Sequence, residues 1–195
     1  AVSMVNIGVV ERDRQHFNSA REHFLKSETE YLNLLEKQPI DSDVHSELGT
    51  CYYNLAQLDR IDGSLIDYQQ HLKNAANQFQ EHIKGHEDNL DMNAVWLMVN
   101  TCRDLGNSYL HNQQPKDAAS WYAKGEHVHQ LLPVDLSTAI NYDALIADLY
   151  ARWGEALRAE GQFAKALSKC QQSLDRWQKL MVLHMDIPEY ARDYA

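Results

Sequence analysis

The chain has 195 residues, a length that fits either one domain or an array of small units that share one core. Its eight glycines and four prolines are too few for a turn-rich β-sandwich or barrel, and they favour long helices. The net charge of −10 argues against nucleic-acid or anionic-lipid partners, and no apolar run reaches the ~18 residues of a membrane span.

Hydrophobic periodicity and helix-boundary residues predict eight helices. In chain order they cover about 1–12, 15–37, 43–60, 65–85, 91–112, 115–131, 137–159 and 162–184. A ninth helix is expected to begin near residue 188 and to be truncated. Because the chain starts without methionine and ends at Ala195 inside a helical pattern, we expect it to be a fragment of a longer protein.

An internal repeat is marked by four glycines, each preceded by an apolar residue: Gly8, Gly49, Gly106 and Gly154. Each is followed by an alanine and, four residues later, by a second marker residue, giving the pairs Ala20/Phe24, Ala75/Phe79, Ala118/Tyr122 and Ala166/Cys170. The alanine comes 12 residues after the glycine in three copies but 26 after Gly49. The excess predicts a second hairpin with about two more turns in each arm, reversing near Asp62-Gly63-Ser64.

This pattern resembles the tetratricopeptide motif W-x2-L-G-x2-Y…A-x3-F over nearly the whole chain. The resemblance implies an all-α solenoid, a right-handed superhelix of antiparallel helix hairpins. We expect a single array over 1–195, with repeats at about 1–40, 41–90, 91–134 and 135–187. Residues 188–195 would begin a fifth.

In such arrays, the first helix of each repeat lines a concave groove that binds peptides. The matching positions give the groove candidates Val5, Val9, Ser46, Thr50, Tyr53, Asn100, Arg103, Asn107, Arg152 and Arg158. Arg103 with Asn107 is expected to face solvent and to bind an acidic segment or a C-terminal carboxylate. The family's clamp for chaperone tails is not predicted, because Arg152 stands where it needs asparagine.

Two histidines, His82 and His86, are the metal candidates, since i and i+4 share a helix face and could bind zinc or nickel. Spacing fixes no third ligand, so no metal and no cofactor is predicted. The sequence has no phosphate-binding glycine-rich loop, nucleophile elbow or kinase signature, and we expect this segment not to be an enzyme.

The three cysteines, Cys51, Cys102 and Cys170, are far apart and form no Cys-x-x-Cys pair. They are expected to be buried thiols in a reducing compartment, which favours a cytoplasmic location.

A second resemblance concerns residues 180–195, which read LMVLHMDIPEYARDYA. The phrase is similar to one in bacterial repeat regions that follow serine/threonine kinase domains, particularly in planctomycete-type proteins. Met185 stands there in place of the usual proline and Ala191 in place of arginine. The resemblance implies the regulatory or substrate-recruiting part of a signalling kinase.

The sequence therefore predicts a non-catalytic scaffold that binds a protein or peptide. Two alternatives stay open: a cytosolic sensor of a small signalling peptide, and an all-α metal-dependent enzyme that uses His82 and His86. Leu180, Met181 and Leu183 lack the cover of a complete next repeat, so weak self-association through this end is also expected.

Overall fold

The computed structural model describes residues 2–39, 41–86, 90–132 and 140–183, and these form eight α-helices with no strand. Their bounds are α1 Val2–Asp13, α2 Phe17–Lys37, α3 Ser42–Asp62, α4 Leu65–Gly85, α5 Met92–His111, α6 Pro115–His129, α7 Ile140–Ala159 and α8 Phe163–Leu183. Within the described residues, observed and predicted boundaries differ by at most two residues. The expected start at 137 and the expected ninth helix lie outside those residues.

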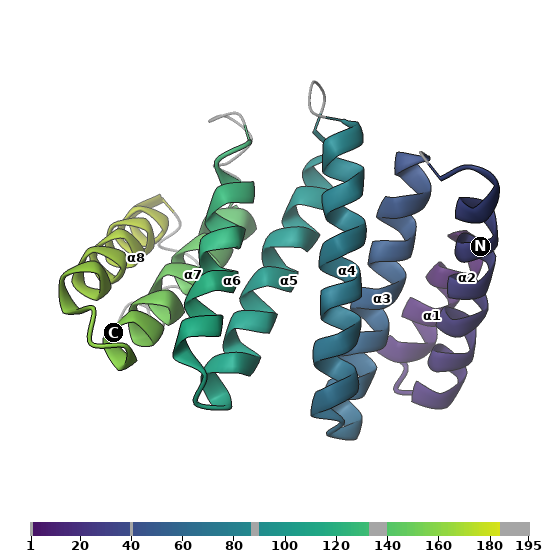
Figure 1. Ribbon diagram of the computed structural model, residues 1–195, viewed down its shortest axis with the longest axis horizontal. Coiled ribbons are helices and arrows are strands. Elements are labelled where there is room, and N and C mark those ends of the chain that lie inside the picture. Colours follow the sequence, from purple (N-terminus) through teal and green to yellow (C-terminus); the bar gives the residue numbers. More distant parts are fainter. Residues whose placement is uncertain (1, 40, 87–89, 133–139, 184–195) are drawn as a thin grey trace. The chain divides into compact units, whose positions relative to one another are not determined.

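The helices form hairpins within two compact units, residues 1–101 and 102–195, and the division falls inside α5. In the first unit α1 packs on α2, α2 on α3, and α3 on α4, the long pair seen side by side in Figure 1. In the second unit α7 packs on both α6 and α8. Whether all repeats form one array stays a prediction.

The repeat register is confirmed at the helix crossings. Each motif glycine faces its expected partner, in the pairs Gly8–Phe24, Gly49–Phe79, Gly106–Tyr122 and Gly154–Cys170. A Cβ added at Gly49 would lie 2.8 Å from the ring of Phe79, so only glycine leaves room for that ring. The four motif alanines are buried as well. Small residues therefore let the two helices of each hairpin approach closely.

In each of the four hairpin turns, one residue shortly before the second helix adopts the left-handed backbone conformation. Two of these residues are Gly63 and Gly161, each with φ 75°, and two are Gln15 and Gln113, with φ 65° and 58°. Gly63 follows Gly49 by 14 residues, whereas Gln113 follows Gly106 by seven. The extra seven residues confirm the predicted elongation of the second hairpin, about 10 Å of helix in that arm.

Replacing Gln113 with glycine should raise the free energy of unfolding by about 0.5–1 kcal/mol. A side chain in the left-handed region costs roughly 1–2 kcal/mol, and the larger unfolded-state entropy of glycine offsets part of the gain. Urea denaturation measures the difference. The matched change Gln130→Gly, at φ −67°, should not stabilise the chain, and equal stabilisation by both variants would contradict this interpretation of the turn.

Candidate functional site

The groove candidates of the first unit are mostly packed rather than open. Val5 is 3% exposed and belongs to the core, which corrects its assignment as a groove surface residue. Val9, Ser46, Thr50 and Tyr53 are half-buried, and the Thr50 hydroxyl donates to the Ser46 carbonyl oxygen at 3.0 Å. This face therefore offers a ligand less apolar surface than the sequence suggested.

Both asparagines that are predicted to line the groove form hydrogen bonds within the protein. Asn100 is buried, and its Nδ2 donates to the Trp96 carbonyl oxygen at 2.9 Å, so it is not open to a ligand as predicted. In the second unit, Asn107 Oδ1 accepts the hydroxyl proton of Tyr122 at 2.7 Å. Each amide thus has a structural role that a ligand would have to compete with.

Arg103 does not face solvent freely, as the sequence had predicted, but is held by acidic neighbours. Its side chain is 24% exposed. Its Nη2 lies 3.0 Å from Asp104 Oδ1, and its Nη1 lies 3.8 Å from Asp148 Oδ2. Arg152 in turn lies 3.6 Å from Asp148 and 3.3 Å from Glu155. The predicted basic patch is therefore an internal network of ion pairs.

Arg158 is the one groove arginine that makes no ion pair with a described residue, and it is exposed near the end of α7. The ion-pair network itself holds two arginines, Arg103 and Arg152, against three carboxylates, those of Asp104, Asp148 and Glu155. The charge of this network is therefore −1, and an acidic ligand gains no net attraction there.

A more favourable surface is a cleft of about 440 Å³ between α6, α7 and α8, all within the second unit. Its lining residues are Lys116, Ala119, Ser120, Trp153, Leu157, Glu160, Gln162, Lys165, Ser168, Lys169 and Gln172. Three lysines against one glutamate make the cleft locally basic on a strongly acidic chain.

Two of these lysines are available to a ligand. Lys116 in the first turn of α6 and Lys165 in the first turn of α8 are exposed and make no ion pair with a described residue. Their ammonium groups can donate hydrogen bonds to a carboxylate without first breaking an internal ion pair.

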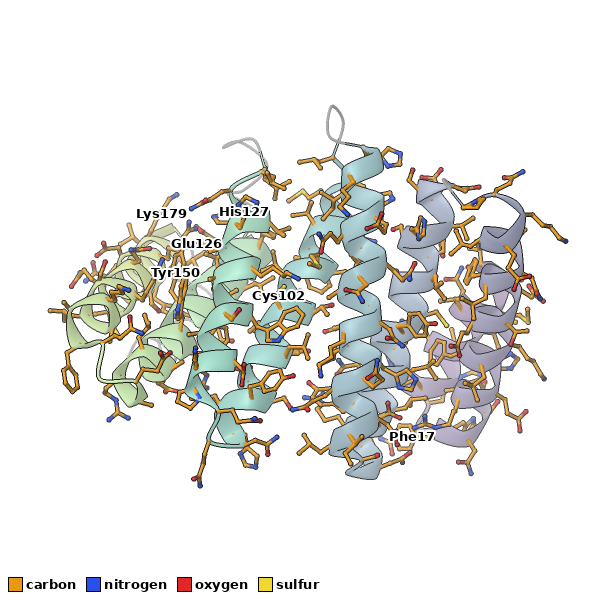
Figure 2. The ribbon with its side chains drawn as sticks, viewed as in Figure 1. Phe17, Cys102, Glu126, His127, Tyr150 and Lys179 are labelled. Atoms are coloured by element: carbon orange, nitrogen blue, oxygen red, sulfur yellow. The ribbon has the colours of Figure 1, made fainter. Side chains whose placement is uncertain are left out.

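Lys169 has a structural role instead. Its ammonium lies 2.6 Å from a Glu126 carboxylate oxygen, 4.1 Å above the Trp153 ring and 4.7 Å above the Tyr150 ring. Glu126 and Tyr150, marked in Figure 2, also interact directly, and burial with the Glu126 charge raises the pKa of Tyr150 to about 12. This arrangement fixes Trp153 as part of the cleft wall.

Glu160 supplies an acceptor in the cleft. One carboxylate oxygen accepts from Gln162 Nε2 at 2.9 Å. The other, Oε1, is buried and has no hydrogen-bond partner within the described part of the chain. A buried acceptor without a donor is costly, so a peptide N–H placed in the cleft would gain from meeting it.

The cysteine prediction is correct for two residues and wrong for one. Cys51 and Cys102 are buried, and burial raises the pKa of each thiol to about 12. Cys170 is exposed on α8, because only one side of it packs on Gly154.

The C-terminal end also differs in detail. Leu180 is not uncovered as expected but is buried beside Ala147 and Trp177, and the side chain of Leu183 lies outside those the structure describes. The exposed apolar side chains of α8 are Phe163, Leu167, Leu174 and Val182. Self-association through this end stays a prediction.

The metal candidates His82 and His86 do lie together in the first unit, with ring centroids 4.5 Å apart and Asp43 beside them.

None of the eight described helices combines the length and hydrophobicity that a bilayer crossing requires.

No family model matches this chain, and no curated protein matches its sequence. The crystal structure of BtubC (BKLC) from P. vanneervenii is similar, with a TM-score of 0.63 at 14% identity over 91% of this chain. The match covers 63% of BtubC, so the chain spans under two thirds of its length. The predicted all-α, tetratricopeptide-like fold is therefore confirmed, while the identity is too low to transfer a function.

Two crystal structures of MamA are also similar, with TM-scores of 0.41 and 0.36 at 18% and 16% identity. The first match covers 91% of this chain and 92% of that one, and the second covers 89% and 95%.

Proposed function

We propose that this chain is a non-catalytic protein-interaction module whose α6–α8 cleft holds an acidic segment of a partner. The observation that carries the proposal is the pair Lys116 and Lys165, which line a cleft, are exposed and form no ion pair with any residue that the structure describes. Stacked helical hairpins generally act through extended surfaces.

The chemistry of the cleft fits a peptide better than a small metabolite. Trp153 and Leu157 provide an apolar wall, the two lysines provide donors, and Glu160 provides a buried acceptor. An extended acidic segment can satisfy all three, because it carries carboxylates, side-chain carbons and backbone N–H groups together. The cleft is open to solvent rather than enclosed, as a continuous peptide requires.

The finer roles predicted from sequence remain part of this proposal. A regulatory or substrate-recruiting role beside a serine/threonine kinase rests on the phrase at residues 180–195. The predicted cytoplasmic location and peptide-sensor role rest on composition and on the repeat resemblance. The groove formed by the first helices, with Arg103 and Asn107, is the alternative binding surface.

A selection from a displayed random peptide library tests the proposal without a known partner. We expect the enriched peptides to be rich in aspartate and glutamate. Fluorescence anisotropy should show that Lys116→Gln/Lys165→Gln binds them about 3- to 10-fold more weakly, since each exposed charge pair contributes about 0.2–1 kcal/mol.

The control is Lys26→Gln/Lys37→Gln, which removes the same charge from two exposed positions on α2. It should bind like the parent. Unchanged binding by the cleft variant, together with a loss in Arg103→Ala, would move the site to the groove. Enriched peptides without acidic residues would contradict the proposed ligand class.

A further inference from the structure

The imidazole of His82 is buried with one nitrogen unpaired. The side chain is 3% exposed, and its Nδ1 lies 2.7 Å from the Ser42 carbonyl oxygen. Because a carbonyl only accepts, Nδ1 carries the proton and Nε2 carries the lone pair. That Nε2 atom is buried and makes no hydrogen bond to a residue of the described ranges 2–39, 41–86, 90–132 and 140–183. A buried lone pair of this kind lacks the partner that native interiors normally supply.

His86, one turn later on α4, has the same tautomer. Its Nδ1 lies 3.2 Å from the His82 carbonyl oxygen and donates to it. Its Nε2 lone pair lies 3.5 Å from the Ser42 hydroxyl, a long hydrogen bond that a metal could replace, and 3.6 Å from Asp43 Oδ1 at the start of α3. The two rings are tilted by 37°. Both imidazoles thus donate from Nδ1 to a backbone carbonyl oxygen and keep a lone pair on Nε2, the arrangement typical of histidines that bind metals.

Two carboxylates, those of Asp43 and Asp91, lie beside the two histidines. Potential ligand atoms of Asp43, His82 and His86 all lie within 4.8 Å of one another. Asp91, which directly precedes α5, places Oδ2 4.0 Å from His82 Nε2. The four side chains come from three separate segments of the first unit.

A glycine permits this convergence. A Cβ added at Gly85 would lie 2.7 Å from Ser42 Cβ, so a larger residue would push the end of α4 away from the start of α3. The close approach is what brings His86 next to Asp43 and the His82 ring onto the Ser42 carbonyl.

We propose that Asp43, His82, His86 and Asp91 form a binding site for a divalent transition metal, and that Zn²⁺ fits it best. Two neutral imidazoles and two carboxylates match the charge and the nitrogen and oxygen ligands that zinc takes. Zinc bonds of ~2.0–2.2 Å place tetrahedral ligand atoms roughly 3.3 Å apart. The exposed carboxylate of Asp43 can close the remaining gap by rotation, and that of Asp91 can do so while giving up the hydrogen bond that its Oδ1 accepts from the Asn93 N–H at 2.9 Å.

The site would be structural, because four protein ligands leave no open position for a substrate. The metal would tie α3, α4 and the start of α5 together, and this role is independent of peptide binding in the α6–α8 cleft.

The test is a ZnCl2 titration of the whole chain after stripping with a chelator, read by competition with a chromophoric chelator. We expect one Zn²⁺ per chain, and Co²⁺ should give the absorption bands of tetrahedral coordination. At a zinc concentration about 100 times the Kd, the melting temperature should rise by roughly 5–10 °C.

Asp43→Asn and His86→Gln should each weaken binding at least tenfold. The Asp43 side chain is 83% exposed and His86 is partly exposed, so both variants should keep the parent circular dichroism spectrum. The control His127→Gln removes an exposed imidazole, labelled in Figure 2, and should bind zinc like the parent. Absence of saturable binding, or parent-like affinity in both ligand variants, would overturn the site.

Discussion

Replacing Phe79 with alanine should lower the free energy of unfolding by about 3–5 kcal/mol, the usual cost of removing a fully buried aromatic ring. Phe79 is 0% exposed and packs against the backbone at Gly49, where α3 and α4 cross. Urea denaturation followed by circular dichroism measures the change. Phe163→Ala, at an α8 position that is 68% exposed, is the matched control and should change stability by less than about 0.5 kcal/mol.

A double-mutant cycle tests whether this packing follows the repeat register. Gly49→Ala alone should cost about 1–3 kcal/mol, because its Cβ would overlap the Phe79 ring. In the Phe79→Ala background that cost should vanish, since the space is empty. Additive effects of the two substitutions would show that the residues do not share the crossing.

Acidification from pH 7 to pH 4 should lower the free energy of unfolding by about 3 kcal/mol through one side chain, His129. Burial lowers its pKa to about 4, and the nearby Arg176 guanidinium acts in the same direction. Asp143 and Glu126 oppose the shift only in part. Arg176 donates to His129 Nε2 at 3.1 Å, and the Tyr142 hydroxyl lies 3.2 Å from Nδ1, so the structure holds the neutral ring.

The unfolded chain has a histidine pKa of about 6.5, so this contribution is complete above that value and is lost as the pH falls toward 4. His129→Gln keeps one hydrogen-bond acceptor and one donor. Between pH 7 and pH 4, the free energy of unfolding of this variant should fall by about 3 kcal/mol less than that of the parent. Denaturant titrations across the range give the comparison, and the exposed His127→Gln should behave like the parent. Equal acid sensitivity in parent and His129→Gln would contradict the assignment.

The fold could be predicted from local signals because the crossings use few residue types. A glycine and a large residue 16 positions later suffice to place a helix pair, as Gly106 and Tyr122 illustrate. The length of the second hairpin followed from counting residues, since helical rise is constant. The left-handed turn at Gln113 was not predictable, because glutamine carries no preference for that backbone conformation.

The candidate sites were harder, because they depend on side chains distant in sequence. The helix register identifies Arg103 as a groove position, but its pairing with Asp148 arises from packing of separate helices. The cleft of Lys116 and Lys165 lies on the second helices, and the family pattern directed attention to the first ones. His82 and His86 were visible as a pair, whereas Asp43 reaches them only through the tight contact at Gly85.

Nuclear magnetic resonance of the isotope-labelled chain during titration with an enriched acidic peptide tests the proposed function most directly. The method reports the location of binding without altering any side chain. We expect the largest amide shift changes at the cleft, around Lys116, Ser120 and Lys165. Changes centred on Arg103 and Asn107, with the cleft amides unaffected, would contradict the account.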